Sequence, residues 1–277
     1  MALHRHLAHL ISSKDRKRDE TLEVEAHEIE PHILHIEINR PDARNAVNGA
    51  VAQAMESHLD KFEGDDNLWI AIISGRGKNF SAGADLKEIA AGNGASLSTP
   101  KGGFAGIANR QRTKPVIAAV HGPALAGGFE IALSADMIVA TEGASFGLPE
   151  VKRSLAAAAG GLFRLPRKIP INRATEMIAT GDPISAKEAH TLGVVNRLAP
   201  SDEELLETAL VLARQVAANA PLAVRKSLEV SRQATILDDA TLFGLSREAM
   251  NYLSTTNDYK EGPRAFIEKR PPIWQGN

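Results

Sequence analysis

The sequence of 277 residues contains no cysteine, and aromatic side chains make up only 4% of it. Without cysteine the protein has no disulfide bond, no thiolate zinc site and no cysteine nucleophile. So few aromatic rings leave little material for base-stacking platforms or for cages around methylated ammonium groups, which need several rings at one place. The chemistry must therefore come from carboxylates, imidazoles, hydroxyls or backbone groups.

An excess of one charge and a long apolar run are also missing. Thirty-two basic and 34 acidic residues give a net charge of −2, so no overall field attracts nucleic acid or anionic lipid. The run from Pro115 to Phe129 is interrupted by Gly122 and Pro123 and is shorter than the roughly 18–20 apolar residues that cross a bilayer. The apolar run near the N-terminus is too short for an export signal. We expect a soluble, cytoplasmic protein without a nucleic-acid or membrane partner.

What the sequence does contain is an alternation of strand and helix patterns. Apolar and polar side chains alternate over residues 33–38, and nearly continuous apolar runs, typical of strands covered on both faces, occupy residues 68–74, 115–120 and 137–140. Helical patterns lie between them, at residues 46–62, 127–134 and 173–179. This alternation predicts an α/β fold.

The C-terminal third has a different, helical character. Ser185 and Ser201 are each followed three residues later by a glutamate, the pattern of a capping box at a helix start. Amphipathic helices are predicted at residues 202–219 and 239–253, with a short strand at 194–198 before them. Their apolar faces suit either core packing or contact between subunits. The stretch 90–106, rich in Gly, Ala and Ser, predicts a mobile loop, and residues 1–20 predict a charged tail.

Three well-known motifs are incomplete or absent. The segment His27–His32 resembles the zinc-protease H-E-x-x-H, but its second histidine is one residue late and Pro31 would break the helix that aligns the ligands. Gly75–Phe80 follows a strand but lacks the third glycine of a dinucleotide fingerprint and the Lys-Ser/Thr of a P-loop. The G-x-S-x-G of serine hydrolases is absent. We therefore expect no metal site.

Two glycine-rich junctions follow two of the buried strands. In Asn79–Leu86, small residues precede Asp85 near a helix start, and His121–Glu130 ends with Gly127 and a second glycine at the start of another helix. Free N–H groups at a helix start stabilise negative oxygen, and two of them converging on one atom would form an oxyanion hole. For His121 itself, turn chemistry is sufficient.

Two glutamates accompany these junctions. Glu130 closes the second junction, and Glu150 follows Pro149 in a turn. Considered singly, each of the 34 acids is more often a solvated surface group. Twenty residues separate the two, so no single helix face holds both. A strand that returns between them, such as residues 137–140, would bring them together.

Six sequence strings in a fixed order carry a resemblance. They are Asn39–Pro41 with Asn45-Ala46, Phe80–Leu86, Lys114–Gly122, Gly127–Glu130, Ala144–Glu150 and Glu261–Phe266. Over roughly residues 22–277 the chain resembles the enoyl-CoA hydratase/isomerase superfamily, the crotonases. The resemblance implies an α/β spiral of strand–strand–helix units whose C-terminal helices assemble homotrimers and often hexamers. It divides the chain into a tail at 1–20, a spiral core at 21–200 and a helical trimerisation region at 201–277.

The resemblance also implies roles for individual residues. Glu130 and Glu150 match the two glutamates that act around one water in hydratases, and the backbone N–H groups of Ala84 and Gly127 match the oxyanion hole. The positions that match contacts to substrate and coenzyme A are Ala43, Arg44, Ala82, Asp85, Leu86, Lys87, Ala158, Phe266 and Lys269.

The activity that the resemblance implies is reversible syn addition of water to a 2-enoyl-CoA, giving a 3-hydroxyacyl-CoA. It needs no metal or redox cofactor, since coenzyme A is part of the acyl-CoA thioester substrate. Several strings also resemble the carnitinyl-CoA dehydratase branch. The alternatives are such a dehydratase, an isomerase that uses Glu150 alone, and a catalytically weak thioester-binding protein.

Two positions depart from the pattern of the family. Ala158 stands where hydratases have a glycine whose N–H helps to position the water, and Ala126 replaces the first glycine of a triple. An alanine keeps the N–H but adds a Cβ, so a narrower pocket or a different acyl group is expected.

Overall fold

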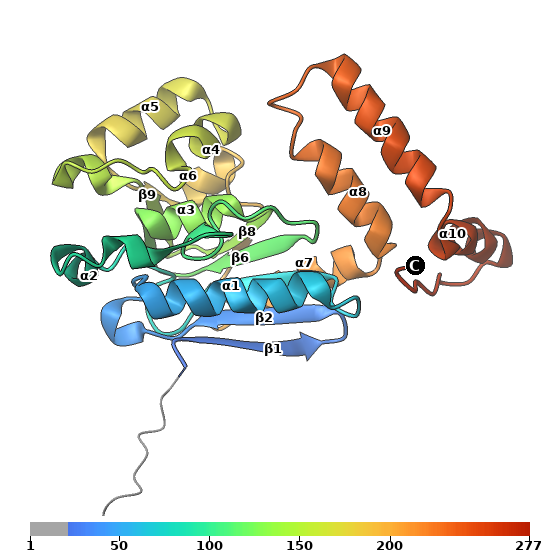
Figure 1. Cartoon of the computed structure of the whole chain (residues 1–277), viewed down its shortest axis with the longest axis horizontal. Coiled ribbons are helices and arrows are strands. Elements are labelled where there is room, and N and C mark those ends of the chain that lie inside the picture. Colours follow the sequence, from blue (N-terminus) through green and yellow to red (C-terminus); the bar gives the residue numbers. More distant parts are fainter. Residues whose placement is uncertain (1–21) are drawn as a thin grey trace, which may run out of the picture.

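The computed structural model describes residues 22–277, and the predicted charged tail at 1–20 lies outside them. The centre of the fold is a six-stranded sheet with the order β1-β2-β3-β6-β8-β11 (Figure 1). Among the described residues, β1 and β2 pair antiparallel and the other neighbours in this sheet pair parallel. Its strands are β1 (Val24–Glu30), β2 (Ile33–Ile38), β3 (Ile70–Gly75), β6 (Val116–Val120), β8 (Met137–Thr141) and β11 (Arg197–Ala199).

A second, smaller sheet forms where the chain continues from β6 and β8 into two short strands, which a third short strand joins. It has the order β10-β9-β7, with β7 (Pro123–Leu125), β9 (Ser145–Gly147) and β10 (Ile184–Ser185). Single bridges join Ser81 to Ala124 and Val47 to Ala84, so the chain segments around residues 81–84 run beside β7. This arrangement brings the two glycine-rich junctions to the same place.

Helices follow pairs of strands in a repeating order. The units are β1-β2-α1, β6-β7-α3 and β8-β9-α4, with α1 (Gly49–Gly64), α3 (Gly127–Ser134) and α4 (Gly161–Lys168). The remaining elements of this part are the 3-10 turns η1 (Pro41–Ala43), η2 (Gly94–Leu97) and η3 (Pro149–Arg153), the helices α2 (Leu86–Ala90), α5 (Ile171–Thr180) and α6 (Ala186–Thr191), and the hairpin of β4 (Ser98–Thr99) and β5 (Gly103–Phe104).

The two faces of the large sheet bury different sets of apolar side chains, because successive residues of a strand point to opposite faces. On one face, strand residues such as Ile70 and Ile72 pack with the buried side of α7 (Leu205–Ala217), including Leu205 and Ala209. The other face packs against α1, α3 and the small sheet in one large cluster that contains most of the core. These strands are thus buried on both faces of the sheet, as their continuous apolar runs predicted.

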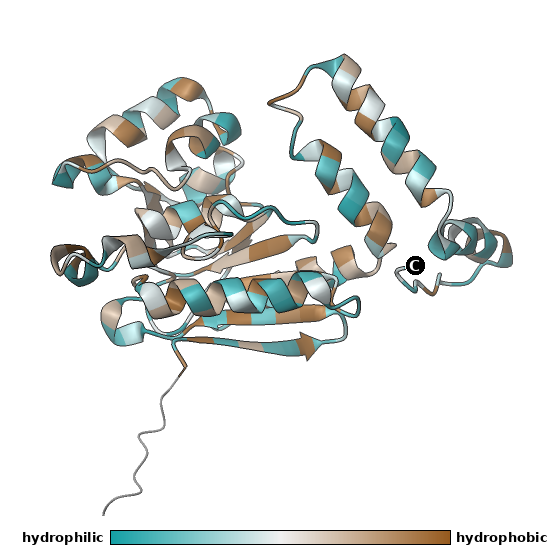
Figure 2. Ribbon diagram, viewed as in Figure 1, coloured by the Kyte–Doolittle hydropathy of each residue, from teal (hydrophilic) through white to brown (hydrophobic). Residues whose placement is uncertain are grey.

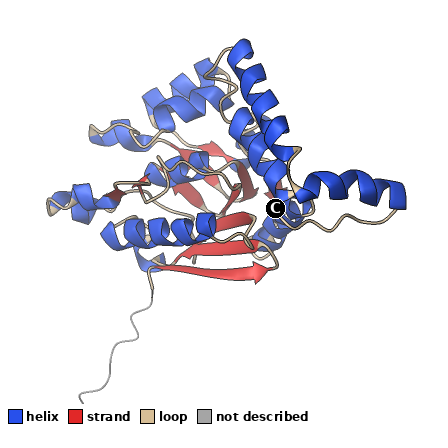
Figure 3. Cartoon of the chain, turned by 45° about the vertical axis from the view of Figure 1, so that its right-hand side comes forward, coloured by secondary structure: helices blue, strands red, loops and turns tan. Residues whose placement is uncertain are grey.

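The last helices stand to one side of the sheets. These are α8 (Pro221–Ser231), α9 (Asp239–Leu253) and α10 (Asn257–Glu268), and all strands lie outside this region (Figures 1 and 3). No residue of α9 is buried, although apolar residues recur along it (Figure 2). Phe243 and Met250 of α9 and Phe266 and Ile267 of α10 are exposed. Of the helices in residues 22–277, none has the length and apolar character that a membrane crossing requires.

Most of the predicted elements are confirmed. The strand at 33–38 and the helices at 127–134 and 239–253 occupy the predicted residues, and the strands at 68–74, 115–120 and 137–140 and the helices at 46–62 and 173–179 differ only at their ends. The Ser185 hydroxyl accepts the N–H of Glu188 and caps α6. Ser201 accepts the N–H of Glu204 in the same way, but regular helix begins only at Leu205.

One expectation about local structure is wrong, and one predicted strand is shifted along the chain. The stretch 90–106 is not a plain loop, because it contains η2 and the β4–β5 hairpin. Tertiary contacts hold it: the carboxylate of Glu56 on α1 accepts the Thr99 hydroxyl at 2.5 Å and the Gly102 N–H at 2.6 Å. The short strand predicted at 194–198 is present as β11 but is shifted towards the C-terminus, to residues 197–199, and Val194 and Val195 are buried just before it.

Candidate active site

A pocket of about 1230 Å³ lies between the two glycine-rich junctions and the segment that follows β9. Eleven of the thirteen predicted site residues line it. They are Ala43, Arg44, Ala82, Ala84, Asp85, Leu86, Lys87, Gly127, Glu130, Glu150 and Ala158. Phe266 and Lys269 do not line it; both lie at the C-terminal end of α10, where Phe266 is 86% exposed. Their contact with coenzyme A stays a prediction.

Backbone geometry brings Ala84 next to Gly127. The N–H of Leu125 donates to the carbonyl of Ser81, which ties the start of the first junction to β7 just before α3 begins. Gly83 takes a positive φ of 84°, and a Cβ there would lie 2.7 Å from the nitrogen of Gly127. Only glycine fits at this point, because the two backbone segments touch.

The N–H groups of Ala84 and Gly127 form what we call the amide pair. Neither donates a hydrogen bond to any acceptor in residues 22–277. Both residues line the pocket, and Gly127 is the first residue of α3, where the positive end of the helix dipole adds to the N–H. Two unpaired donors at one edge of a cavity suit a negatively charged oxygen.

Ala126, directly before Gly127, has an unusual backbone conformation. Its φ of 51° and ψ of −129° fall in a region that glycine adopts and that alanine rarely does. Its N–H donates to the carbonyl of Gly147 at 2.9 Å, so a strand bond holds the chain in this conformation. The alanine at this position therefore carries backbone strain at the start of α3.

Glu130 is buried, with 4% of its surface exposed, one turn along α3 from Gly127. Its carboxylate accepts the N–H of Gly161 at 2.9 Å, and the N–H of Ala159 favours the same charged form. Burial raises the pKa of Glu130, while the two N–H groups and the Arg164 guanidinium oppose the rise. The carboxylate is thus fixed in position by its neighbours.

Glu150 lies in η3, directly after Pro149. Burial, together with the charge of Glu130, raises the pKa of Glu150 to about 7. Its Oε2 atom is buried and has no hydrogen-bond partner in the described part of the chain. Glu150 is therefore available to exchange a proton with a bound molecule near neutral pH.

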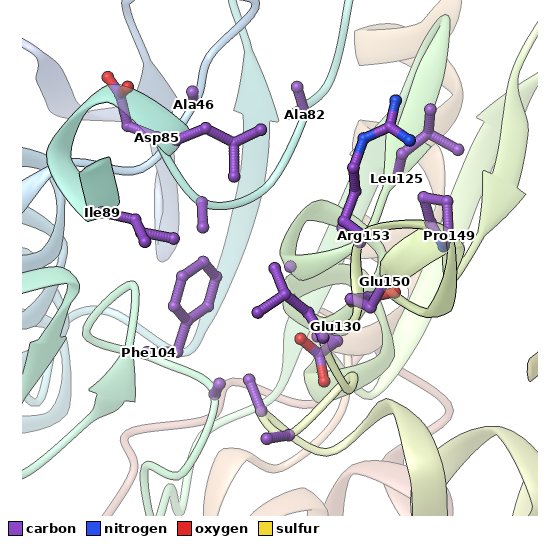
Figure 4. A pocket seen from close by; sticks show the side chains of 18 of the residues that line it. Ala46, Ala82, Asp85, Ile89, Phe104, Leu125, Glu130, Pro149, Glu150 and Arg153 are labelled. Atoms are coloured by element: carbon purple, nitrogen blue, oxygen red, sulfur yellow. The ribbon is translucent and has the colours of Figure 1, made fainter. Parts of the chain in front are cut away.

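Glu130 and Glu150, the glutamate pair, are neighbours in space, as Figure 4 shows, with Phe104 and Ile89 across the pocket from them. β8 returns between the two residues, as expected for the segment 137–140, and β9 then leads into η3. The charge of Glu130 also raises the pKa of Glu150, which indicates the same proximity. The two glutamates thus share one pocket, although 20 residues separate them in the sequence.

The loop of four alanines after η3 forms the wall beside Glu130. Ala156, Ala158 and Ala159 line the pocket, whereas Ala157 is buried. The N–H of Ala158 donates to the carbonyl of Ala156 at 2.8 Å, within the loop itself. The N–H groups of this loop that meet the glutamate pair are those of Ala159 and Gly161, on Glu130.

The opposite rim of the pocket carries paired charges. Arg40 forms an ion pair with Asp85 at 3.1 Å and donates to the carbonyl of Ala46. Burial alone would raise the pKa of Asp85, but the bonds from Arg40 and from the N–H of Lys87 outweigh it, and the pKa is lowered. Asp85 also caps α2 through that N–H, as its place before a helix predicted.

Sequence reasoning did not single out Phe104, Arg164 or Arg40, which also line the pocket. Phe104 packs against Gly127 so closely that a Cβ on Gly127 would lie 2.5 Å from the ring. Arg164 donates to the carbonyls of Ala159 and Ala108. Arg40 stands within one of the strings that carry the resemblance, so that string was an available signal for it.

Comparison with known proteins gives a consistent result. The enoyl-CoA hydratase/isomerase family matches residues 28–277. Carnitinyl-CoA dehydratase of Salmonella heidelberg is 43% identical over 250 residues, which are 88% of this chain and 95% of that protein.

Solved structures agree. The structure of enoyl-CoA hydratase from Mycobacterium tuberculosis H37Rv is 44% identical, with a TM-score of 0.88, over 92% of this chain and all of that one. That of carnitinyl-CoA hydratase from Mycobacterium avium is 43% identical, with a TM-score of 0.74, over 92% of this chain and 99% of that one. The predicted crotonase fold is confirmed, and this chain belongs to the enoyl-CoA hydratase/isomerase family.

Proposed function

We propose that this protein catalyses the reversible syn addition of water to a 2-enoyl-CoA, giving a 3-hydroxyacyl-CoA. The observation that carries the proposal is the presence of the glutamate pair and the amide pair in one pocket. Hydration of a conjugated thioester needs a base for the water, an acid for C2 and a site for negative charge on the thioester oxygen. In the pocket, Glu130 can serve as the base, Glu150 as the acid and the amide pair as the site for the negative charge.

Glu130 is the base that we assign to the water. It is held by the N–H of Gly161 and lies near the positive charge of Arg164, so its charged form is favoured over what burial alone would allow. The water oxygen forms a bond to C3 while its proton passes to the Glu130 carboxylate. A positioned base of this kind contributes about 10²- to 10⁴-fold to the rate.

Glu150 supplies the proton for C2. Its pKa of about 7 keeps a large fraction protonated at neutral pH, unlike an ordinary surface glutamate. When the proton bonds to C2, the enolate oxygen loses its negative charge and the thioester carbonyl forms again. The reverse sequence eliminates water, since both steps are reversible.

The amide pair holds the enolate oxygen. Donors of this kind act through electrostatics that are already in place before the reaction, and losing one commonly costs about 10²- to 10³-fold in rate. The coenzyme is proposed to lie along Ala43, Arg44, Ala82 and Asp85–Lys87. No metal or redox cofactor is needed for these steps.

Three alternatives differ in the groups that they use. An isomerase would move a double bond with Glu150 alone, and the hydrogen-bonded Glu130 in the same pocket disfavours it. A dehydratase acting on a carnitinyl thioester, as the names of several relatives state for those proteins, would use the same two glutamates in the elimination direction. A catalytically weak thioester-binding protein would retain the pocket without turnover.

We also propose that α8–α10 assemble the protein into a homotrimer or a dimer of trimers in the cytoplasm. Phe243 and Met250 of α9 and Phe266 and Ile267 of α10 are exposed, and no residue of α9 is buried, so these helices have apolar side chains that a partner subunit could cover. Light scattering of the purified protein measures the assembly directly. A monomer would contradict this part of the proposal.

A substrate screen tests the activity. Purified protein is mixed with 2-enoyl-CoA, 3-enoyl-CoA and 3-hydroxyacyl-CoA thioesters of the same acyl length, and absorbance of the conjugated thioester is followed. We expect loss of absorbance with the 2-enoyl compound and a gain with the 3-hydroxyacyl compound. Turnover of the 3-enoyl compound alone would favour the isomerase, and tight binding without any turnover would favour the weak paralogue.

A further inference from the structure

The end of the pocket beside Glu130 has a distinctive set of walls, which we call the acyl end. It is made of Ala108, Ala158–Gly160, Phe163 and Arg164. Under the proposed function C3 of the substrate lies at the water held by Glu130, while the coenzyme lies towards Arg40 and Asp85. The acyl chain beyond C3 therefore extends into the acyl end, and the walls there decide which acyl groups fit.

A free carboxylate is the first means of recognising a cationic acyl group, and no carboxylate at the acyl end is free for this role. The acids that line the pocket are Asp42, Asp85, Glu130 and Glu150. Asp42 lies in η1 and Asp85 pairs with Arg40, both at the opposite rim. Glu130 and Glu150 are the reacting groups, so neither serves as a fixed counter-ion for a substrate charge.

Aromatic rings are the second means of holding a quaternary ammonium group, and the two rings that line the pocket already pack against other groups of the protein. Phe104 and Phe163 are the aromatic residues that line the pocket in the described chain. The ring of Phe163 lies 5.2 Å from the guanidinium carbons of both Arg164 and Arg167, and Phe104 packs on Gly127. A cage for an ammonium group needs several free rings around one point.

A positive charge already occupies the acyl end. The guanidinium of Arg164 donates to the carbonyls of Ala159 at 2.9 Å and Ala108 at 2.6 Å, which fixes it within the wall. Glu130 and Arg164 both engage Ala159, one through its N–H and the other through its carbonyl, so the two charges lie on either side of one residue. A second cation beside this guanidinium would be repelled by its charge.

From these walls we propose that the acyl end accepts acyl groups without a fixed positive charge and excludes acyl groups that carry a quaternary ammonium. The inference rests on the proposed function for the direction in which the acyl chain points. It separates this chain from the carnitinyl-CoA enzymes to which it is similar, because a carnitinyl group bears a trimethylammonium. Ala158, whose exposed side chain lines the pocket next to Ala159, is the position at which an added charge should change this preference.

Binding of two unreactive thioesters tests the preference. 5,5-Dimethylhexanoyl-CoA and 4-(trimethylammonio)butanoyl-CoA have acyl groups of nearly the same shape and differ in charge, because a carbon atom in the first stands in place of the quaternary nitrogen in the second. Dissociation constants are measured by isothermal titration with wild-type protein, with Ala158→Asp and with the uncharged control Ala158→Asn. Thermal unfolding of each variant shows that it is folded.

We expect the wild-type protein to bind the cationic thioester about tenfold or more weakly than 5,5-dimethylhexanoyl-CoA. Ala158→Asp adds a carboxylate at the acyl end, so it should reduce this ratio by about tenfold, whereas Ala158→Asn should leave it unchanged. Equal or tighter wild-type binding of the cationic thioester overturns the inference. So does the absence of binding for both thioesters, or a shift by Ala158→Asp no larger than that by Ala158→Asn.

Hydration of 2-butenoyl-CoA by the same wild-type preparation separates the two claims. Hydration without discrimination between the two unreactive thioesters would refute the inference and leave the proposed function intact. Discrimination without hydration would refute the proposed function and leave the binding preference intact. If Ala158→Asp does not fold, the ratio for the wild-type protein still decides the inference.

Discussion

The amide pair and the glutamate pair lie in the same pocket but are held by different means. The amide pair is fixed by the backbone, through the bridges beside β7 and through glycines that have no room for a side chain. In the glutamate pair, Glu130 is fixed by burial and by the N–H groups of Ala159 and Gly161, and Glu150 is placed by the η3 turn. The function of the amide pair should therefore be sensitive to added atoms, and that of the glutamate pair to changes of charge.

The largest effect should come from removing the charge of a glutamate. Glu130→Gln and Glu150→Gln keep nearly the same shape but remove the proposed base or acid, so each should lower kcat/KM by about 10²- to 10⁴-fold. Steady-state hydration of a short 2-enoyl-CoA measures the loss. The exposed Glu142 lies outside the pocket, and Glu142→Gln is the matched control. Near-wild-type turnover by both pocket variants would contradict the assignment.

A single methyl group should damage the amide pair almost as much. In Gly127→Ala the new Cβ would lie 2.5 Å from the ring of Phe104, so the ring or the start of α3 must move. Because the oxyanion donors depend on this backbone, we expect kcat to fall by about 10²- to 10³-fold.

The control for this variant is Gly143→Ala, since Gly143 has open space around its Cα. It should keep wild-type activity and stability. Equal activity of both alanine variants would show that the backbone at Gly127 is not part of the reaction. A pH profile of Gly127→Ala should keep the wild-type shape, because no titrating group is changed.

The pH dependence of hydration should report the glutamate pair. The protonated form of Glu150 is the proposed acid, and its pKa is raised to about 7, so kcat/KM should fall about tenfold per pH unit above pH 7. Loss at low pH should follow protonation of Glu130. Rates in Glu150→Gln, although small, should lose the alkaline limb; an unchanged limb would assign it to another group.

The free energy of unfolding should also depend on pH through the ionisation of Glu150. The pKa of Glu150 is higher in the folded state than in the unfolded chain, so its stabilising contribution is present below the unfolded pKa and is lost as pH rises through about 7. Glu150 is only partly buried, so we expect a loss on the order of 1 kcal/mol. Urea unfolding of wild type and Glu150→Gln at several pH values measures it, and parallel curves would contradict it.

The smallest effect concerns the strained alanine beside the amide pair. Ala126→Gly relieves a φ of 51° with a ψ of −129°, and after the added entropy of the unfolded chain we expect a gain of about 1 kcal/mol in the free energy of unfolding. Ala91→Gly, where φ is −79°, is the control and should lose stability. Destabilisation by Ala126→Gly would show that the methyl group packs favourably.

Local patterns predicted the parts of the site that depend on one stretch of chain. The pair of glycines after a buried strand predicted the start of α3 at Gly127, and an aspartate before a helix predicted the cap of α2 by Asp85. Both are confirmed. β1 was not predicted, because its sequence is mostly polar and it forms as an edge strand with ion pairs such as Glu25 with Arg76. β7 and β9 are three residues long, too short for a periodic signal.

Contacts across long sequence distances explain what the sequence alone did not indicate. Phe104 reaches the pocket from a hairpin that is held to α1 by Glu56, and nothing near residue 104 in the sequence announces that bond. Arg164 becomes part of the wall by bonding Ala108, which lies 56 residues earlier. The proximity of Glu130 and Glu150 was conditional on a returning strand, and β8 satisfies the condition.

The central claim is that the glutamate pair adds water across a 2-enoyl-CoA on one face. Hydration of 2-butenoyl-CoA in D₂O, followed by proton NMR of the product, tests it most directly. We expect one deuterium at C2, in a single configuration that is syn to the hydroxyl at C3. Deuterium at C4, a mixture of configurations at C2, or no hydroxyl product would contradict it.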